Sequence, residues 1–265
     1  MATHPVNNYK RVYMRESLDL YFGELAEALR KADPTMAPEE IILVGGAAVI
    51  AEYRFRGTAD GMSVIIQMTP VMEQAIGQVE RKFNLPPGWL ENDFIYSDGY
   101  SERIREVAVP YKTFGDVLHV RAVTGAYLIA VKLRSGRKSR RDLSDVVGIL
   151  GEHEKRGESI SIEDVRNAAA ELYGDWESIG APFRAFVEDV IRAGDYEDRY
   201  VTLSVEEQQT GDVLRKFHGT SGVTASKPNR ISTLPDHQKT PSIQARFQRR
   251  QAQRDIAQEL EQEKE

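Results

Sequence analysis

Two adjacent glycines at the end of an apolar run are the first residues whose type and position suggest chemistry. Ile41 to Val44 is a short apolar segment typical of a buried strand, and Gly45-Gly46 follows it directly. A strand that ends in glycines and opens a helix lets the backbone approach a ligand closely, and free N–H groups at the helix start can hold phosphate oxygens. For the glycine pair alone, the alternative is a tight strand-to-helix turn without a ligand.

A threonine and an acid precede the next predicted strand. Thr58 and Asp60 lie just before the apolar run Val64 to Ile66. Acidic residues at this place can hold Mg²⁺ against a phosphate that is bound at the glycines. Two carboxylates on one strand must stand at i and i+2, because only that spacing puts both on the same face. The pattern therefore predicts a phosphate- and metal-binding segment between Ile41 and Ile66.

A basic turn followed by two acids is the next group of interest. Its basic residues are Arg134, Arg137, Lys138, Arg140 and Arg141. Asp142 and Asp145 follow, and their spacing puts them on one face of a helix. They can orient the basic side chains or accept a proton from an attacking hydroxyl. The alternative is a pair of acids favoured by the helix dipole, with ordinary surface ion pairing.

In this order the motifs resemble the nucleotidyltransferase-fold proteins of the polymerase-β superfamily. The most similar group is the bacterial one that includes the abortive-infection toxins of type IV toxin–antitoxin pairs and their uncharacterised relatives. The segments that match are Gly45-Gly46-Ala47-Ala48, Arg56-Gly57-Thr58-Ala59-Asp60, Trp89-Leu90-Glu91-Asn92-Asp93, and Lys132-Leu133 with Arg137, Arg141, Asp142 and Asp145. The resemblance covers about residues 38–152.

The resemblance implies an enzyme that moves a nucleotide from a nucleoside triphosphate to a hydroxyl of RNA or protein, with a toxin-like role. It implies Mg²⁺ or Mn²⁺ as the cofactor and a cognate antitoxin as a partner. Asp60 would bind the metal and act in catalysis with Lys132 and Asp145. Nucleotide binding would fall to Gly45, Gly46, Arg56, Thr58, Arg137 and Arg141. Cations there would neutralise charge that develops on the transferred phosphoryl group.

The chain departs from this group at position 62, where the resemblance expects a second acid and the sequence has Met62. A thioether is a soft, weak ligand and does not replace a carboxylate on magnesium. Three alternatives are open. Another acid, Asp116 or Asp145, completes the site; or Asp60-Gly61 forms a bulge that shifts the register; or the protein is a catalytically degenerate binding module.

Hydrophobic periodicity predicts the elements that position these residues. Predicted helices cover 16–31, 47–55, 70–83, 127–134, 141–153, 162–173 and 182–193. Predicted strands cover 41–44, 63–68, 103–111 and 117–123. Together they predict an α+β fold with a nucleotidyltransferase-like small mixed sheet flanked by helices, followed by a helical C-terminal region and a flexible tail.

The domain boundaries follow from changes in composition. We expect a nucleotidyltransferase-like domain with its N-terminal helix over 1–155 and a helical subdomain over 156–217. Residues 218–242 are rich in Gly, Ser, Thr, Pro and Lys, which is typical of a flexible linker. Residues 243–265 are rich in Gln, Arg and Glu, and we expect a charged helix or tail there.

Composition excludes several classes of protein. The 265 residues include no cysteine, which excludes a disulfide scaffold, thiolate zinc sites and cysteine nucleophiles. No apolar run approaches the roughly 18 to 20 residues that span a bilayer, and the N-terminus has no signal-peptide core. We therefore expect a cytoplasmic protein without membrane contact. The net charge of −6 argues against general attraction to nucleic acid.

Overall fold

The computed structural model describes residues 13–135 and 141–220, with side chains as far as residue 210. The chain divides into two compact units, Met1–Ser221 and Gly222–Glu265, and the described residues all belong to the first. The predicted tail 243–265, and the predicted linker 218–242 from residue 221 on, therefore lie outside the described residues. The fold is of the mixed α+β class, as the sequence predicts.

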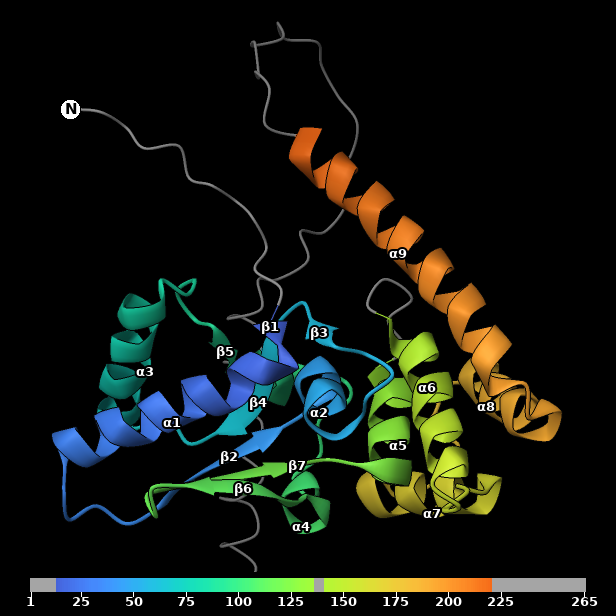
Figure 1. Cartoon of the computed structure of the whole chain (residues 1–265). Coiled ribbons are helices and arrows are strands. Elements are labelled where there is room, and N and C mark those ends of the chain that lie inside the picture. The colour runs from blue at the N-terminus through green and yellow to red at the C-terminus, as the bar shows by residue number, and fades with distance from the viewer. Residues whose placement is uncertain (1–12, 136–140, 221–265) are drawn as a thin grey trace, which may run out of the picture. The chain divides into compact units, whose positions relative to one another are not determined.

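A five-stranded mixed sheet lies at the centre of this unit (Figure 1). Its strands, in the order β5-β4-β2-β7-β6, are β5 (Leu90–Glu91), β4 (Met62–Ile66), β2 (Glu39–Leu43), β7 (Leu118–Ala122) and β6 (Val109–Phe114). The central strand β2 runs antiparallel to β4 and parallel to β7. A separate two-stranded ladder pairs β1 (Tyr13–Met14) with β3 (Thr58–Ala59). The predicted apolar run before the glycine pair is thus the middle of the sheet.

Helices cover the sheet and extend beyond it (Figure 1). They are α1 (Arg15–Ala32), α2 (Gly45–Glu52), α3 (Pro70–Phe83), the 3-10 helix η1 (Asn92–Tyr96), α4 (Ile104–Val107), α5 (Gly125–Ser135), α6 (Asp142–Lys155), α7 (Ile162–Tyr173), α8 (Ala181–Ala193) and α9 (Tyr196–Thr220). Helices α1 and α3 pack on each other, whereas α5 packs on α6 and α7, and α9 packs on α6. The helices after residue 155 therefore pack directly on the two helices that follow the sheet.

Local signals in the sequence explain several of these boundaries. Helix α7 begins where the sequence predicts, because Ser161 and Asp164 form a reciprocal capping box at its start. Pro70 lies in the first turn of α3, and the Thr69 side chain caps that helix.

The predicted strand over 103–111 is wrong in its first half. Residues Ile104–Val107 form the short helix α4, and β6 begins only at Val109. Ile104 and Ala108 are both buried and the Ala108 N–H donates to the Ile104 carbonyl, so their four-residue spacing is helical. Over so short a segment, the order of apolar and polar residues fits the period of a strand and the period of a helix equally well.

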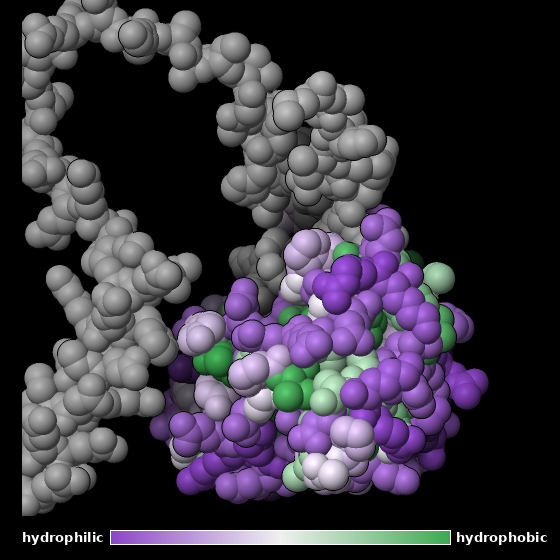
Figure 2. Space-filling model, turned by 90° about the vertical axis from the view of Figure 1, so that its left-hand side faces the viewer, coloured by the Kyte–Doolittle hydropathy of each residue, from purple (hydrophilic) through white to green (hydrophobic). Residues whose placement is uncertain are grey.

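The surface of the described unit is mostly hydrophilic on the face shown in Figure 2, with a few hydrophobic side chains near its centre. Within residues 13–135 and 141–220, no helix combines the length and the apolar character needed to cross a membrane.

Candidate functional site

The glycine turn has the geometry of an anion-binding helix start. Gly45 opens α2 with a φ of +54°, a conformation that favours glycine. The N–H of Val44 donates to the carbonyl of Ser63 at 3.1 Å, which ties the turn to β4. None of the first three N–H groups of α2, those of Gly45, Gly46 and Ala47, donates a hydrogen bond to another described residue. These groups are therefore available to an anion.

Arg56 places a positive charge beside these N–H groups. Its side chain is buried; Nε donates to the Thr58 carbonyl at 2.7 Å and Nη1 donates to Asp145 Oδ2 at 2.6 Å. The remaining nitrogen, Nη2, makes no hydrogen bond to a described residue and lies 3.6 Å from the place that a Cβ on Gly46 would take. One guanidinium nitrogen thus lies directly beside the glycine turn. Burial lowers the pKa of Arg56, but the negative charges of Asp145 and Asp60 outweigh this effect and raise the pKa above its ordinary value.

Asp145 is shared between two cations in a buried network. Its Oδ2 accepts from Arg56 and from Lys132 Nζ, the latter at 2.7 Å, and Lys132 also contacts Asp142 Oδ1 at 3.2 Å. All four side chains are at most 7% exposed. Burial lowers the pKa of Lys132, but Asp145 and Asp142 more than offset this and raise it. The two positive and two negative charges therefore balance inside the protein.

Asp60 and Met62 do not share a strand face. The bend at Asp60-Gly61 separates β3 from β4, and Met62 begins β4 with its side chain fully buried. Asp60 is half-buried at the same edge of the sheet as the glycine turn, near Arg56. Ser63, not Met62, faces the turn, since its Cβ lies 4.0 Å from an ideal Cβ on Gly45. The break at Asp60-Gly61 alters the register that the i, i+2 spacing assumes.

The acids considered as replacements for position 62 do not lie open to the glycine turn. Asp116 is exposed in the turn between β6 and β7. Leu118 pairs with Glu39, so Asp116 lies at the start of β2, whereas the glycine turn follows its end. Asp145 is close to Arg56, but the two cations described above bind its carboxylate.

Glu91 is the acid near this edge to which the sequence assigned no role. β5 pairs parallel to β4 with Glu91 opposite Ser63. The two carboxylate oxygens of Glu91 lie 2.6 and 2.8 Å from the place that a Cβ on Gly61 would take. The Glu91 carboxylate makes no hydrogen bond or ion pair to the side chain of a described residue. The pairing of β5 with β4 brings Glu91 to this edge of the sheet. Gly61 leaves room for the Glu91 carboxylate because it has no Cβ.

The magnesium site that the resemblance implies lacks the carboxylate expected at position 62. Among residues 13–135 and 141–220, no three His, Asp or Glu side chains come together in a way that could hold a metal ion. Mg²⁺ prefers near-octahedral oxygen ligands, and Met62 contributes none. Asp145 is already bound by Arg56 and Lys132. Mg²⁺ or Mn²⁺ therefore stays a prediction, and we derive no chemical step through it.

The other predicted nucleotide-binding residues have different surroundings. Thr58 is half-buried and its carbonyl accepts from Arg56. Arg141 is half-buried at the start of α6 and adopts a left-handed conformation with a φ of +58°. Arg137 lies outside the described residues.

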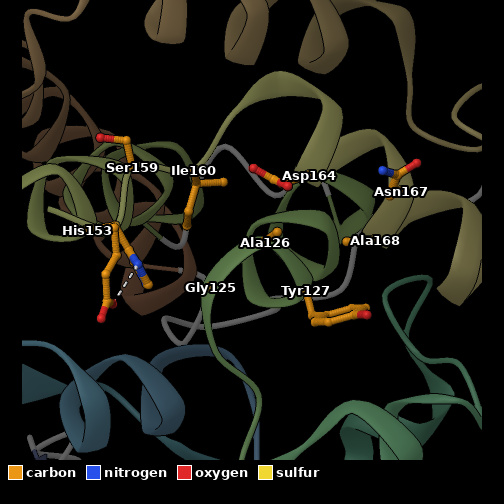
Figure 3. Close-up of a pocket in the computed structure, with 10 residues that line it drawn as sticks. Gly125, Ala126, Tyr127, His153, Ser159, Ile160, Asp164, Asn167 and Ala168 are labelled. Carbon is orange, nitrogen blue, oxygen red and sulfur yellow. Dashed lines mark ion pairs between the residues drawn. The ribbon is translucent and has the colours of Figure 1, made fainter.

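Away from the glycine turn, a cavity of about 450 Å³ opens between the start of α5, the last turn of α6 and the start of α7 (Figure 3). Behind it the buried Tyr53 hydroxyl accepts from the Gly125 N–H at 2.7 Å and lies 3.2 Å from His153 Nε2. Burial lowers the pKa of His153 and raises that of Tyr53 to about 12. The contacts of Tyr53 with Gly125 and His153 join the end of α2 to α5 and α6.

No family model, no curated protein and no solved structure matches the chain. The case for a nucleotidyltransferase-like site therefore depends on the motifs and on the geometry described above.

Replacing Met62 tests whether this position faces the core. We expect Met62→Asp to lower the free energy of unfolding by more than about 3 kcal/mol, because it buries a carboxylate without a partner. Met62→Leu keeps volume and apolar character and should cost less than about 1.5 kcal/mol. Urea denaturation measures both. An aspartate that is tolerated as well as leucine would show that position 62 faces a polar site instead.

Replacing Lys132 tests the buried network. Lys132→Met leaves Asp142 and Asp145 with less compensating charge, and we expect a loss of about 3–5 kcal/mol in the free energy of unfolding. Lys155→Met is the matched control, because Lys155 is exposed on α6 and its surface ion pair contributes at most about 1 kcal/mol. Equal, small losses in the two variants would contradict a structural role for Lys132.

Proposed function

We propose that the chain is a nucleotidyltransferase-like binding module that holds the phosphates of a nucleoside triphosphate at the glycine turn without transferring the nucleotide. The observation that carries this proposal is the convergence of four donors. The N–H groups of Gly45, Gly46 and Ala47 donate to no other described residue, and Arg56 Nη2 lies beside Gly46. Helix starts bind phosphate through such N–H groups, and a guanidinium adds charge and a geometry that matches phosphate oxygens.

The same geometry argues against transfer. Nucleotidyl transfer depends on cations that stabilise the developing phosphoryl charge and on a group that activates the attacking hydroxyl. Lys132 is 2% exposed and is paired with two carboxylates, so it cannot reach a triphosphate while this network persists. Arg56 and Lys132 both donate to the same oxygen of Asp145, Oδ2, so that atom is not free for an attacking hydroxyl. Position 62 supplies no ligand for a metal.

Magnesium-dependent transfer to an RNA or protein hydroxyl is the second candidate function. One observation favours it: Asp60 lies at the edge of the sheet that carries the glycine turn, and the Glu91 carboxylate lies against the neighbouring Gly61. A toxin-like role with a cognate antitoxin would belong to this candidate.

Equilibrium binding of the four ribonucleoside triphosphates, measured by calorimetry, tests the binding proposal. Gly46→Ala places a methyl group between the helix N–H groups and Arg56 Nη2, while its nearest other contacts stay in the ordinary range. We expect affinity to fall about tenfold, because a charged hydrogen bond is weakened. Gly57→Ala is the control, since nothing lies within 4 Å of a Cβ there. A wild-type protein that binds none of the four would contradict the proposal.

Incubation with Mg²⁺, α-labelled triphosphates and RNA or protein acceptors separates the two candidates. We expect no label on either acceptor. Label that appears with the wild type and disappears in Asp60→Ala would establish transfer and overturn the non-catalytic assignment.

A further inference from the structure

Glu207 joins the long helix α9 to the start of α6. Its carboxylate accepts hydrogen bonds from the N–H groups of Leu143 and Ser144, at 3.0 and 3.2 Å, and from the Ser144 hydroxyl at 2.5 Å. Glu207 is 7% exposed, whereas its neighbours Glu206 and Gln208 on the same helix are exposed. A carboxylate of the chain itself therefore satisfies the free N–H groups at the start of α6.

A second contact of α9 lies on the other side of the Arg56–Asp145 ion pair. The Tyr200 hydroxyl donates to the carbonyl of Phe55, the residue before Arg56, at 3.2 Å. Glu207 holds the turn that carries Asp145. Helix α9 thus contacts both chain segments that contribute the ion pair.

Apolar side chains also hold α9: Tyr196, Tyr200 and Leu203 pack against the core. A groove of about 860 Å³ lies between α6, α9 and the segment at Arg54 and Phe55. Val201 and Val205, on α9, are 57% and 50% exposed. The polar contacts of Glu207 and Tyr200 therefore act beside this apolar packing, and such local contacts can open without unfolding the core.

We propose that α9 is a strap that controls phosphate binding at the glycine turn. When Glu207 is bound to α6, the first turn of α6 holds Asp145 against Arg56, and Arg56 keeps Nη2 beside Gly46. When Glu207 leaves, that turn loosens and Arg56 loses the partner that orients it. The inference rests on the proposed binding of a triphosphate and adds a means of regulating it.

The contacts between the strap and the turn are contiguous. Glu207 binds Ser144, the next residue Asp145 binds Arg56 Nη1, and Arg56 Nη2 lies beside Gly46. Coupling between two sites is reciprocal, so a triphosphate that binds the oriented Arg56 also stabilises the bound state of α9. The path consists of two hydrogen-bonded contacts, one step along the chain from Ser144 to Asp145, and the approach of Arg56 Nη2 to Gly46.

A variant of Glu207 tests the proposal, and the same change at the neighbouring Glu206 is the matched control. Glu207→Gln removes the charge at the start of α6, whereas Glu206→Gln changes an exposed residue on the same helix. We expect Glu207→Gln to bind ATP about tenfold more weakly and to exchange amide hydrogens faster over 142–147 and 196–210. ATP should slow exchange in α9 of the wild type and of Glu206→Gln.

The outcomes separate this inference from the proposed function. If the wild type binds no triphosphate, the proposed function fails, and the strap has no site to control. If the wild type binds ATP and Glu207→Gln binds it equally well, the strap is overturned while the function stands. If Glu207→Gln does not fold, Tyr200→Phe serves instead, because it removes only the bond to Phe55. Unchanged ATP affinity and exchange in that variant overturn the strap.

The pH dependence of stability gives an independent check on the buried carboxylate. Burial raises the pKa of Glu207, and Asp145, which faces it from α6, raises it further, although hydrogen bonds from Ser144 and Leu143 oppose the shift. A group whose pKa is raised on folding stabilises the fold at low pH and loses that contribution as pH rises through the folded value. The wild type should therefore gain stability relative to Glu207→Gln as the pH falls from 7 towards 4.5. Chemical denaturation at several pH values measures this difference. A difference that does not vary with pH would show that Glu207 is not buried against α6.

Discussion

The carboxylate of Asp145, shared between Arg56 and Lys132, is the interaction on which the site depends. It joins the loop after α2 to α5 and α6, two helices that lie far from this loop in the sequence. A buried charge without a partner costs several kcal/mol, so each member of the network requires the others. Because every charge is compensated, the network can lie inside the protein and hold Arg56 in one orientation beside the glycine turn.

This constraint decides what the site can do chemically. In a transferase, the cations that bind a triphosphate must be free to contact it, whereas Lys132 is paired with Asp142 and Asp145. One nitrogen of Arg56 remains directed to the turn, next to N–H groups that have no described acceptor. The proposed phosphate site therefore has free N–H groups and one guanidinium nitrogen, whereas Lys132 and Asp145 are paired with each other and Met62 stands where the resemblance expects an acid.

In our proposal, helix α9 regulates the orientation of Arg56 through this network. Its buried carboxylate binds the start of α6 one residue before Asp145, so the position of a surface helix and the orientation of Arg56 are linked by direct contacts. The loss of the Glu207 and Tyr200 contacts would adjust this link, since such local contacts can open without global unfolding. A binding module with such a helix can report ligand binding at one place by a change at another.

The sequence by itself determined the local features: the buried strand before Gly45, the helix start after it, the capping box at Ser161 and the α+β class. These follow from periodicity, glycine conformation and capping, which act over a few residues. Only the tertiary structure decided that Met62 faces the core, that Glu91 lies against Gly61, and that Lys132 and Asp145 neutralise each other. Arg56 and Asp145 are separated by 89 positions. Spacing along the chain carries no information on such a contact, because strand pairing and helix packing bring the two together.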